Sequence, residues 1–314
     1  MNHAPIIDIL MSTYNGSRYL RDQLESIHAQ TFQDWRLLVR DDGSSDRTVE
    51  IVKEYQTLFG NKLVVFKEVN VGVINSFSTL LSLSSAPYVM FCDQDDVWMT
   101  DKLEAMLLEI KNQESVWGRE TPILLFSDLI LVDNALKPLA DSFWRSHGVN
   151  PEHINLSRLL LQNIVTGCAS IFNRALVDVS SPIQEGAVMH DWWLALHACI
   201  YGKLVPISRA TVNYRQHGEN QVGANTLEIS RLFKIIAKPL QLRQRIRRIL
   251  IDTSVQAKAV LKAAHNNIRL EHRDLLQGYA DIAKMSFFKK RIFLLKYNIR
   301  FSSFYRNCAF FLFI

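Results

Sequence analysis

Acidic side chains cluster in two short segments that each follow a run of mainly apolar residues. Asp41-Asp42-Gly43-Ser44-Ser45-Asp46 follows the run at 36–40, and Asp93-Gln94-Asp95-Asp96 follows the run at 88–92. Carboxylates this close repel a diphosphate unless a divalent cation lies between them. Mg²⁺ and Mn²⁺ take one or two protein carboxylates and leave other positions to phosphate oxygens. The pair Asp93 and Asp95 therefore predicts such a site, and the alternative is that these residues cap the next helix or are solvated.

The elements that must position these segments alternate regularly over the first 130 residues. Period and apolar content predict strands at 6–11, 36–40, 63–66, 88–92 and 123–126, and helices at 17–30, 46–59, 73–83 and 101–110. This alternation predicts an α/β fold with a mostly parallel sheet flanked by helices. Ligands bind at the carboxyl ends of such strands. Ser12-Thr13-Tyr14-Asn15-Gly16 and both acidic segments fall there, so we expect one site.

Several function classes lack their motifs. The chain has no GxGxxG after its first strand, no GxxxxGK[ST], no HExxH and no GxSxG, which argues against classical dinucleotide, P-loop, zinc-protease and serine-hydrolase sites. Four widely spaced cysteines without a CxxC pair fit the thiols of a cytosolic protein. No signal-peptide pattern and no apolar run of about 20 residues is visible, so we expect a cytoplasmic protein.

Six segments in order carry a resemblance to a known family. They are Ser12-Thr13-Tyr14-Asn15-Gly16, Asp41-Asp42-Gly43-Ser44-Ser45-Asp46, Asn70-Val71-Gly72, Asp93-Gln94-Asp95-Asp96-Val97-Trp98, His190-Asp191-Trp192-Trp193 and Tyr214-Arg215-Gln216-His217. The series resembles the family 2 glycosyltransferases with the GT-A fold, over about residues 6–220. The residues of the last three segments are most similar to those of the rhamnosyltransferase-like branch, which builds bacterial surface polysaccharides such as O-antigen.

The resemblance implies a nucleotide site and a metal site. The residues that would bind the nucleotide are Ser12, Thr13, Tyr14, Asp41, Asp42, Asp93 and Gln94. A carboxylate such as Asp42 can accept the imide N–H of uracil or thymine. Asp93 and Asp95 would face the metal and the diphosphate, with Asp95 as the direct ligand and Mg²⁺ or Mn²⁺ as the cofactor. His217 matches a histidine that reaches the metal or the diphosphate; the alternative is a loop histidine hydrogen-bonded to backbone.

Asp191 occupies the position where this family has its general base. An inverting transfer needs a carboxylate near the acceptor hydroxyl to take its proton, while a metal stabilises the departing charge. The alternative is that Asp191 only caps the helix that begins there. Among the aromatic residues we expect Trp98 or Trp192 to contact a sugar, although most such residues belong to a core. His190 replaces an acidic residue often found there, and we assign it to the acceptor and sugar side.

The charge is distributed unevenly. Residues 1–230 carry 18 Lys and Arg against 27 Asp and Glu, whereas residues 231–314 carry 18 against 4. In the second part, cations alternate with apolar and aromatic residues, as in 243–251 and 287–295. This pattern resembles an interfacial amphipathic surface attracted to an anionic membrane. The alternative is a helical bundle packed on the catalytic domain. The sequence contains no known nucleic-acid-binding motif, so we expect no nucleic acid as a partner.

These observations together predict a catalytic GT-A domain at 1–225 and a basic helical region at 226–314. The expected reaction is metal-dependent, inverting transfer of a sugar from a nucleoside diphosphate sugar to a hydroxyl of a growing, in this family often lipid-linked, glycan. By resemblance the donor is dTDP-L-rhamnose, with a UDP-hexose or UDP-hexosamine as the runner-up. A nucleotidyltransferase and a non-catalytic sugar-binding module are the other classes considered. Peripheral association with the inner face of the cell membrane is the expectation for the basic region.

Overall fold

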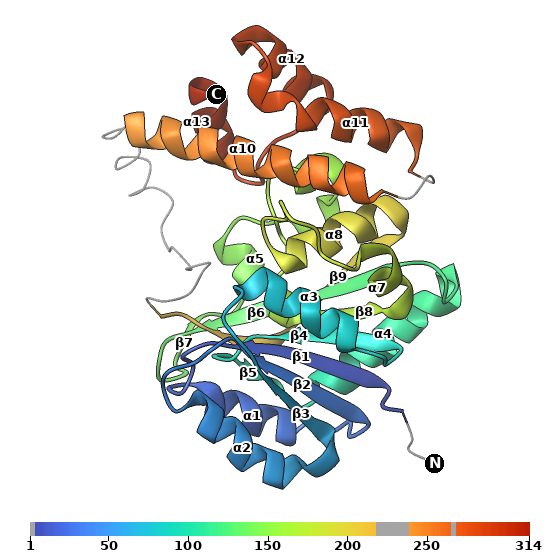
Figure 1. Cartoon of the computed structure of the whole chain (residues 1–314). Coiled ribbons are helices and arrows are strands. Elements are labelled where there is room, and N and C mark those ends of the chain that lie inside the picture. Colours follow the sequence, from blue (N-terminus) through green and yellow to red (C-terminus); the bar gives the residue numbers. More distant parts are fainter. Residues whose placement is uncertain (1–3, 218–238, 265–267) are drawn as a thin grey trace.

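The computed structural model describes residues 4–217, 239–264 and 268–314. Its described strands form one mixed sheet in the order β3-β2-β1-β4-β8-β6-β9-β5, with β7 paired to β6. In Figure 1, α1 and α2 cover one face of the sheet and α3 lies on the other, while α8 lies between the sheet and α10. The predicted α/β fold with flanking helices and a helical C-terminal part is confirmed.

The first half of the sheet is parallel, as predicted. It contains β1 (Ile7–Thr13), β2 (Trp35–Asp41), β3 (Leu63–Lys67) and β4 (Tyr88–Cys92), connected through α1 (Leu20–His28), α2 (Thr48–Phe59) with the short η1 (Gly60–Lys62), and α3 (Val73–Leu83). All residues of β4 are buried, as expected for a strand covered on both faces. The parallel register aligns Thr13 with Asp41, so the polar loops leave the sheet at one edge.

The second half of the sheet departs from the parallel pattern. It contains β5 (Val97–Trp98), β6 (Ile123–Val132), β7 (Pro138–Ala140), β8 (Ser170–Asn173) and β9 (Lys203–Arg215). β8 runs antiparallel to both β4 and β6 and directly follows the single-turn η3 (Gly167–Ala169). The helices that accompany these strands are α4 (Lys102–Trp117), α5 (Phe143–Ser146), η2 (Pro151–His153), α6 (Leu156–Leu159), α7 (Arg174–Ser180) and α8 (His190–Tyr201).

The C-terminal part is helical wherever it is described. Its elements are α10 (Pro239–Ala263), α11 (Leu270–Ala280), η4 (Ile282–Lys284), α12 (Phe287–Lys296) and α13 (Phe304–Phe313). The expected domain boundary at 225/226 lies outside the described residues and stays a prediction. Among the described helices, none combines the length and the apolar content needed to cross a bilayer.

α10 packs on the first part of the chain through polar as well as apolar contacts. The buried Gln256 accepts a hydrogen bond at 2.8 Å from the backbone N–H of Val188, which lies just before α8. Farther along, the N–H of Ser302 donates to Gln162 Oε1 at 3.1 Å. The helices therefore pack on the first part, as the bundle interpretation expects, and α10 supports the segment that leads into Asp191.

Candidate active site

A cavity of about 820 Å³ opens where the polar loops meet. Its wall contains ten of the residues that the sequence assigned to a site: Ser12, Tyr14, Asp42, Asp93, Gln94, Asp95, His190, Asp191, Trp192 and His217. Three assigned residues, Thr13, Asp41 and Trp98, are absent from that wall. The loops after β1, β2 and β4, the end of β9 and the start of α8 thus converge on one site.

Thr13 and Asp41 lie behind the cavity and shape its edge. The Thr13 hydroxyl donates to Asp41 Oδ1 at 3.1 Å, and the backbone N–H of Ser44 donates to Asp41 Oδ2 at 2.9 Å. Both side chains are almost fully buried. The turn also needs Gly43, whose φ of 81° suits a residue without Cβ. Asp41 therefore holds the turn after β2, and the nucleotide contacts assigned to Thr13 and Asp41 stay a prediction.

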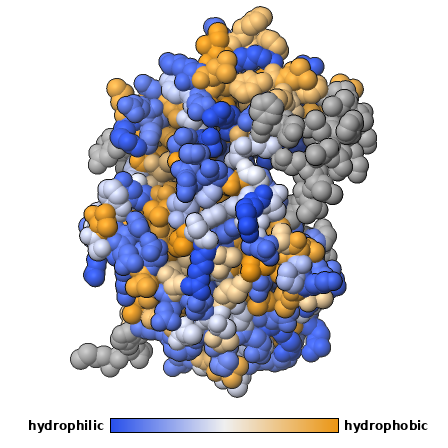
Figure 2. All heavy atoms as spheres, turned by 180° about the vertical axis from the view of Figure 1, so that it is seen from behind, coloured by the Kyte–Doolittle hydropathy of each residue, from blue (hydrophilic) through white to orange (hydrophobic). Residues whose placement is uncertain are grey.

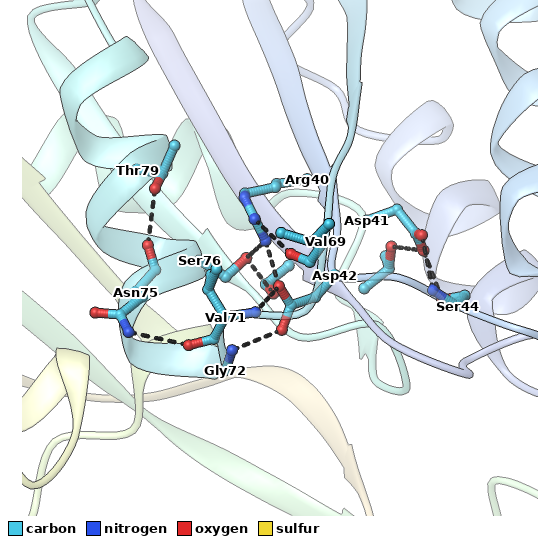
Figure 3. A network of polar contacts seen from close by, with 12 residues as sticks. Arg40, Asp41, Asp42, Ser44, Val69, Val71, Gly72, Asn75, Ser76 and Thr79 are labelled. Atoms are coloured by element: carbon cyan, nitrogen blue, oxygen red, sulfur yellow. Dashed lines mark hydrogen bonds and ion pairs between the residues drawn. The ribbon is translucent and has the colours of Figure 1, made fainter.

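Asp42 is the centre of a polar network at the cavity wall (Figure 3). Its two oxygens accept the backbone N–H groups of Val71 and Gly72, each at 2.9 Å. Asp42 also forms a buried ion pair with Arg40, which donates in turn to the carbonyl of Val69 at 3.0 Å. Three of the roughly four lone-pair positions of the carboxylate are thus engaged. Asp42 fixes the segment 69–72 over the cavity, and its contact with a nucleobase stays a prediction.

Gln94 links the loops after β1 and β4. Its Oε1 accepts the N–H of Tyr14 at 2.9 Å, and its Nε2 donates to the carbonyl of Tyr14 at 3.1 Å. A Cβ at Gly16 would lie 2.2 Å from Gln94 Oε1, so this clamp requires glycine at position 16. The Tyr14 ring remains half-exposed and is free to stack on a planar ligand.

The acidic segment after β4 brings carboxylates and one imidazole together. His217 Nε2 lies 2.6 Å from Asp95 Oδ2, and the His217 ring stacks on Tyr19 with centroids 5.0 Å apart. Burial, together with the charges of Asp95 and Asp191, raises the pKa of Asp93 to about 7. Like charges gathered in one cavity favour the binding of a cation, although the buried Lys102 ammonium offsets part of the effect on Asp93.

The donor set fits a hard divalent cation at Asp93 and Asp95. Asp93, Asp96 and Cys168 also offer ligand atoms within 4.8 Å of one another. Burial raises the pKa of the Cys168 thiol well above its usual range, however, and a protonated thiol is a poor ligand for Mg²⁺ or Mn²⁺. Asp93 and Asp95, which face the cavity, are therefore the better oxygen ligands. In the observed geometry His217 orients Asp95 through a hydrogen bond, as carboxylates that bind metals are commonly held, and direct metal binding by His217 stays a prediction.

Arg215 is a supporting residue that the sequence interpretation missed. Its buried guanidinium donates to the carbonyl of Asp95 at 2.8 Å, to the carbonyl of Asn134 at 2.6 Å and to Asp22 at 2.7 Å. Its own N–H donates to Asp96 Oδ1 at 3.1 Å. Arg215 therefore ties the acidic segment to the end of β9, two residues before His217. Its place in the last of the six sequence segments was the available signal.

Asp191 faces the cavity from the first turn of α8. The N-cap residue of this helix is Met189, so Asp191 is not the N-cap itself, and its role as a general base stays a prediction. Its Oδ1 accepts from Asn163 Nδ2 at 3.0 Å and from the N–H of Trp192 at 2.6 Å, and its Oδ2 accepts from the N–H of Gly167 at 3.1 Å. Burial raises the pKa of Asp191 to about 6, although these hydrogen bonds oppose the rise. The carboxylate is thus held in a fixed direction and has a raised proton affinity.

The other assigned residues on this side differ in exposure to the cavity. Burial lowers the pKa of His190 to about 3, so its ring is neutral, and the ring stacks on Phe77 with centroids 3.9 Å apart. Among the residues that the structure describes, none forms a hydrogen bond with a ring nitrogen of His190. Trp192 lines the cavity and donates through Nε1 to the carbonyl of Leu159 at 2.6 Å. Trp98 is only 2% exposed and lies under the Lys102 ammonium, so the core position is the one observed.

The family follows from comparison with known proteins. The sequence model of glycosyl transferase family 2 matches residues 8–178. The dTDP-rhamnosyl transferase RfbG of Shigella flexneri is 29% identical over 224 residues, which cover 68% of this chain and 74% of that protein. A glucosyltransferase of Escherichia coli, WfgD, named as acting on α-D-GlcNAc-diphosphoundecaprenol with UDP-Glc, is 27% identical over 55% of this chain. That match covers 62% of the glucosyltransferase, less than two thirds of its length.

Solved structures show the same fold. Staphylococcus aureus TarS 1–349 in complex with UDP-GlcNAc superposes with a TM-score of 0.56 at 17% identity, covering 93% of this chain and 79% of that one. The Pyrobaculum calidifontis mannosyltransferase PcManGT, in complex with GDP-Man and Mn²⁺, gives a TM-score of 0.51 at 15% identity, covering 95% and 87%. With the family match over more than half of its length, the chain belongs to glycosyl transferase family 2 and is a glycosyltransferase with a nucleotide-sugar donor.

Proposed function

We propose that this protein catalyses metal-assisted, inverting transfer of a sugar from a nucleoside diphosphate sugar to a hydroxyl of a growing surface glycan. One observation carries the proposal: Asp191, a buried carboxylate with a raised pKa, faces the same cavity as the pair Asp93 and Asp95. A base and an anchor for the diphosphate in one cavity are what such a transfer needs.

Asp191 would act as the general base. A carboxylate with a pKa of about 6 is ionised at neutral pH and accepts a proton better than an ordinary aspartate does. Its hydrogen bonds from Asn163 and Gly167 fix the direction of the oxygens, and they leave a lone pair on Oδ2 for the acceptor hydroxyl. The base is thus oriented before the acceptor arrives, which lowers the entropic cost of the transfer.

The diphosphate would lie at the end of β4. Asp93 and Asp95 would hold Mg²⁺ or Mn²⁺ there, and a bound cation would neutralise the charge that develops on the leaving diphosphate. His217 keeps Asp95 oriented through the hydrogen bond at 2.6 Å. The half-exposed Tyr14 ring and the wall at Asp42 would bind the base and the ribose, and His190 and Trp192 would contact the sugar or the acceptor.

The donor that we propose is dTDP-L-rhamnose, on the basis of the similarity to a dTDP-rhamnosyl transferase over two thirds of the chain. UDP-hexoses and UDP-hexosamines are the competing donors, since similar proteins are named with them. The acceptor that we propose is a lipid-linked glycan at the anionic inner face of the cell membrane, supported by the basic C-terminal helices.

A panel of nucleotide sugars tests the proposal directly. dTDP-L-rhamnose, UDP-glucose, UDP-GlcNAc and GDP-mannose are each added with and without Mn²⁺ while thermal unfolding is recorded. A ligand at 100 times its dissociation constant adds about 2.7 kcal/mol to the unfolding free energy. We expect the largest metal-dependent stabilisation with dTDP-L-rhamnose. A larger stabilisation by a UDP-sugar would show that the donor is a UDP-sugar and not dTDP-L-rhamnose. If no nucleotide sugar stabilises the protein in a metal-dependent way, the proposed metal site at Asp93 and Asp95 is wrong.

A further inference from the structure

The helix α12 presents an apolar row to solvent. Phe288, Ile292 and Leu295 are 74%, 65% and 68% exposed. Their spacing of four and three residues places them on one face of the helix. A surface helix normally turns such a row toward the core, so an exposed row on one face indicates a surface that is covered by something else.

The opposite face of α12 is already packed. Leu294 is fully buried, and the Phe293 ring lies so close to Gly278 of α11 that a Cβ there would come within 2.3 Å of the ring. Farther along, Thr253 Oγ1 and Tyr279 Oη, 2.8 Å apart, connect α10 to α11. The burial of Leu294 and the packing of Phe293 on α11 fix the rotation of α12 about its own axis. Within the described residues the helix therefore cannot bury the exposed row by turning.

The charges around this row have one sign. Residues 282–314 contain seven Lys and Arg and no Asp or Glu. Lys289 and Lys296 are exposed and adjoin the row on α12. Arg291 differs, because its guanidinium donates to the carbonyls of Phe311 and Ile314 at 2.7 and 2.9 Å and lies over the Phe287 ring. Arg291 joins α12 to α13, so it belongs to the fold and is not a free surface charge.

We propose that α12 lies in the headgroup region of an anionic phospholipid bilayer, with Phe288, Ile292 and Leu295 inserted and Lys289 and Lys296 at the phosphates. An apolar row combined with cations is the chemistry that interfacial helices use, and α12 itself carries no Asp or Glu that an anionic leaflet would repel. Figure 2 shows hydrophobic and hydrophilic side chains interspersed at the end of the molecule formed by the C-terminal helices. The inference deepens the proposed function by placing the enzyme where a lipid-linked acceptor would be.

Vesicle co-flotation with a matched control tests the apolar row. The full-length protein is mixed with phosphatidylglycerol and phosphatidylcholine vesicles, without any donor or acceptor. The double variant Phe288→Ser with Ile292→Ser should bind at least about tenfold more weakly, because each side chain loses buried apolar area. Leu108→Ser with Val116→Ser removes residues of similar exposure, 63% and 67%, from α4 and should bind like the unchanged protein.

A second pair of variants tests the cations. Lys289→Gln with Lys296→Gln should weaken binding about 30-fold, at about 1 kcal/mol for each cation near the surface. Lys53→Gln with Lys111→Gln removes two exposed lysines from α2 and α4 and should change little. Binding of the unchanged protein should also fall with salt, because the Debye length shrinks from about 10 Å at 0.1 M to about 3 Å at 1 M.

Two results would overturn the inference. One is equal vesicle binding by the α12 variants and their controls, or binding equally strong to vesicles of phosphatidylcholine alone. The other is self-association in sedimentation without lipid that Phe288→Ser with Ile292→Ser abolishes, which would make a second copy the occupant of this face. Donor affinity, measured on the same variants, should stay unchanged. A failure of the proposed transfer activity is therefore distinguishable from a failure at the membrane.

Discussion

The two parts of this molecule use charge in opposite ways. In the first part, charged side chains such as Asp42, Asp191 and Arg215 are buried and held by specific hydrogen bonds around one cavity. In the helices from 239 onward, Lys and Arg greatly outnumber acidic residues, and the Lys289 and Lys296 side chains are exposed at the surface. A buried, oriented charge acts singly on a reacting group, whereas exposed charges act as a sum that salt screens. Single substitutions should therefore have large effects in the first part and small ones in the second.

The largest effect is expected at Asp191. Asp191→Asn should lower turnover by about 10²–10⁴, the range for a positioned general base, while donor affinity changes little. Asn163→Ala is the matched control, because it removes the hydrogen bond to Asp191 Oδ1 but leaves the carboxylate. It should cost about 1 kcal/mol of unfolding free energy and lower turnover far less than Asp191→Asn does, because the base remains and is still held by Gly167 and Trp192. Equal losses of turnover in both variants would mean that Asp191 is only structural.

Arg215 should come next, as a positioning residue. Arg215→Met leaves the carbonyls of Asp95 and Asn134 without this donor, and each lost hydrogen bond should cost about 0.5–1.5 kcal/mol of unfolding free energy. Chemical unfolding should show this loss, and the metal-dependent part of donor affinity should fall with it. Asp22→Asn breaks only the ion pair between Arg215 and the half-exposed Asp22 carboxylate. This change should cost about 0–1 kcal/mol of unfolding free energy. If both variants are equally stable, Arg215 does not organise the acidic segment.

Gly278 tests whether the two parts are energetically separable. A Cβ there would meet the Phe293 ring, so Gly278→Ala should cost about 1–3 kcal/mol of unfolding free energy through overpacking. Gln277→Ala, at the exposed neighbouring position, should not. Donor affinity should be unchanged in both variants. A loss of donor affinity in Gly278→Ala alone would show that the C-terminal helices support the cavity more strongly than the contact between Gln256 and Val188 indicates.

A smaller, graded effect is expected from pH. Without metal, the pKa of Asp93 is raised to about 7, and a protonated carboxyl group must lose its proton to bind a cation. Mn²⁺ affinity should therefore rise by up to about tenfold per pH unit below pH 7 and level off above it. Calorimetric titrations at pH 6, 7 and 8, in buffers of different ionisation heat, measure both the affinity and the released proton. An affinity independent of pH would contradict the assignment of Asp93 as a ligand.

Much of this organisation was predictable from the sequence, because it rests on local patterns. Apolar runs and helical spacing predicted the first four strands and three helices, and the parallel order placed their polar loops at one edge. Register fixes side chains much more finely. The side chains of neighbouring residues such as Asp41 and Asp42 point to opposite sides. Only the structure shows that Asp41 holds the turn after β2 while Asp42 lines the cavity.

The rest depended on contacts between residues far apart in the chain. Asn163 and Gly167 reach Asp191 from 28 and 24 positions away, and Arg215 reaches Asp95 across 120. No local pattern encodes such pairs. The burial of Trp98 has the same origin, since Lys102 and the sheet enclose it only after folding. Likewise, the residues of the four-residue strand β8 do not reveal in which direction it runs in the sheet.

One binding measurement tests the metal-bridged cavity most directly. Donor affinity is measured by calorimetry with Mn²⁺ and with a chelator, for the unchanged protein and for Asp95→Asn, with Lys289→Gln as a control from the basic helices. We predict a large gain in affinity with Mn²⁺ for the unchanged protein and the control, and the loss of most of this gain in Asp95→Asn, because the carboxylate that would join the cation to the diphosphate is gone. An undiminished Mn²⁺-dependent gain in Asp95→Asn would contradict the assignment.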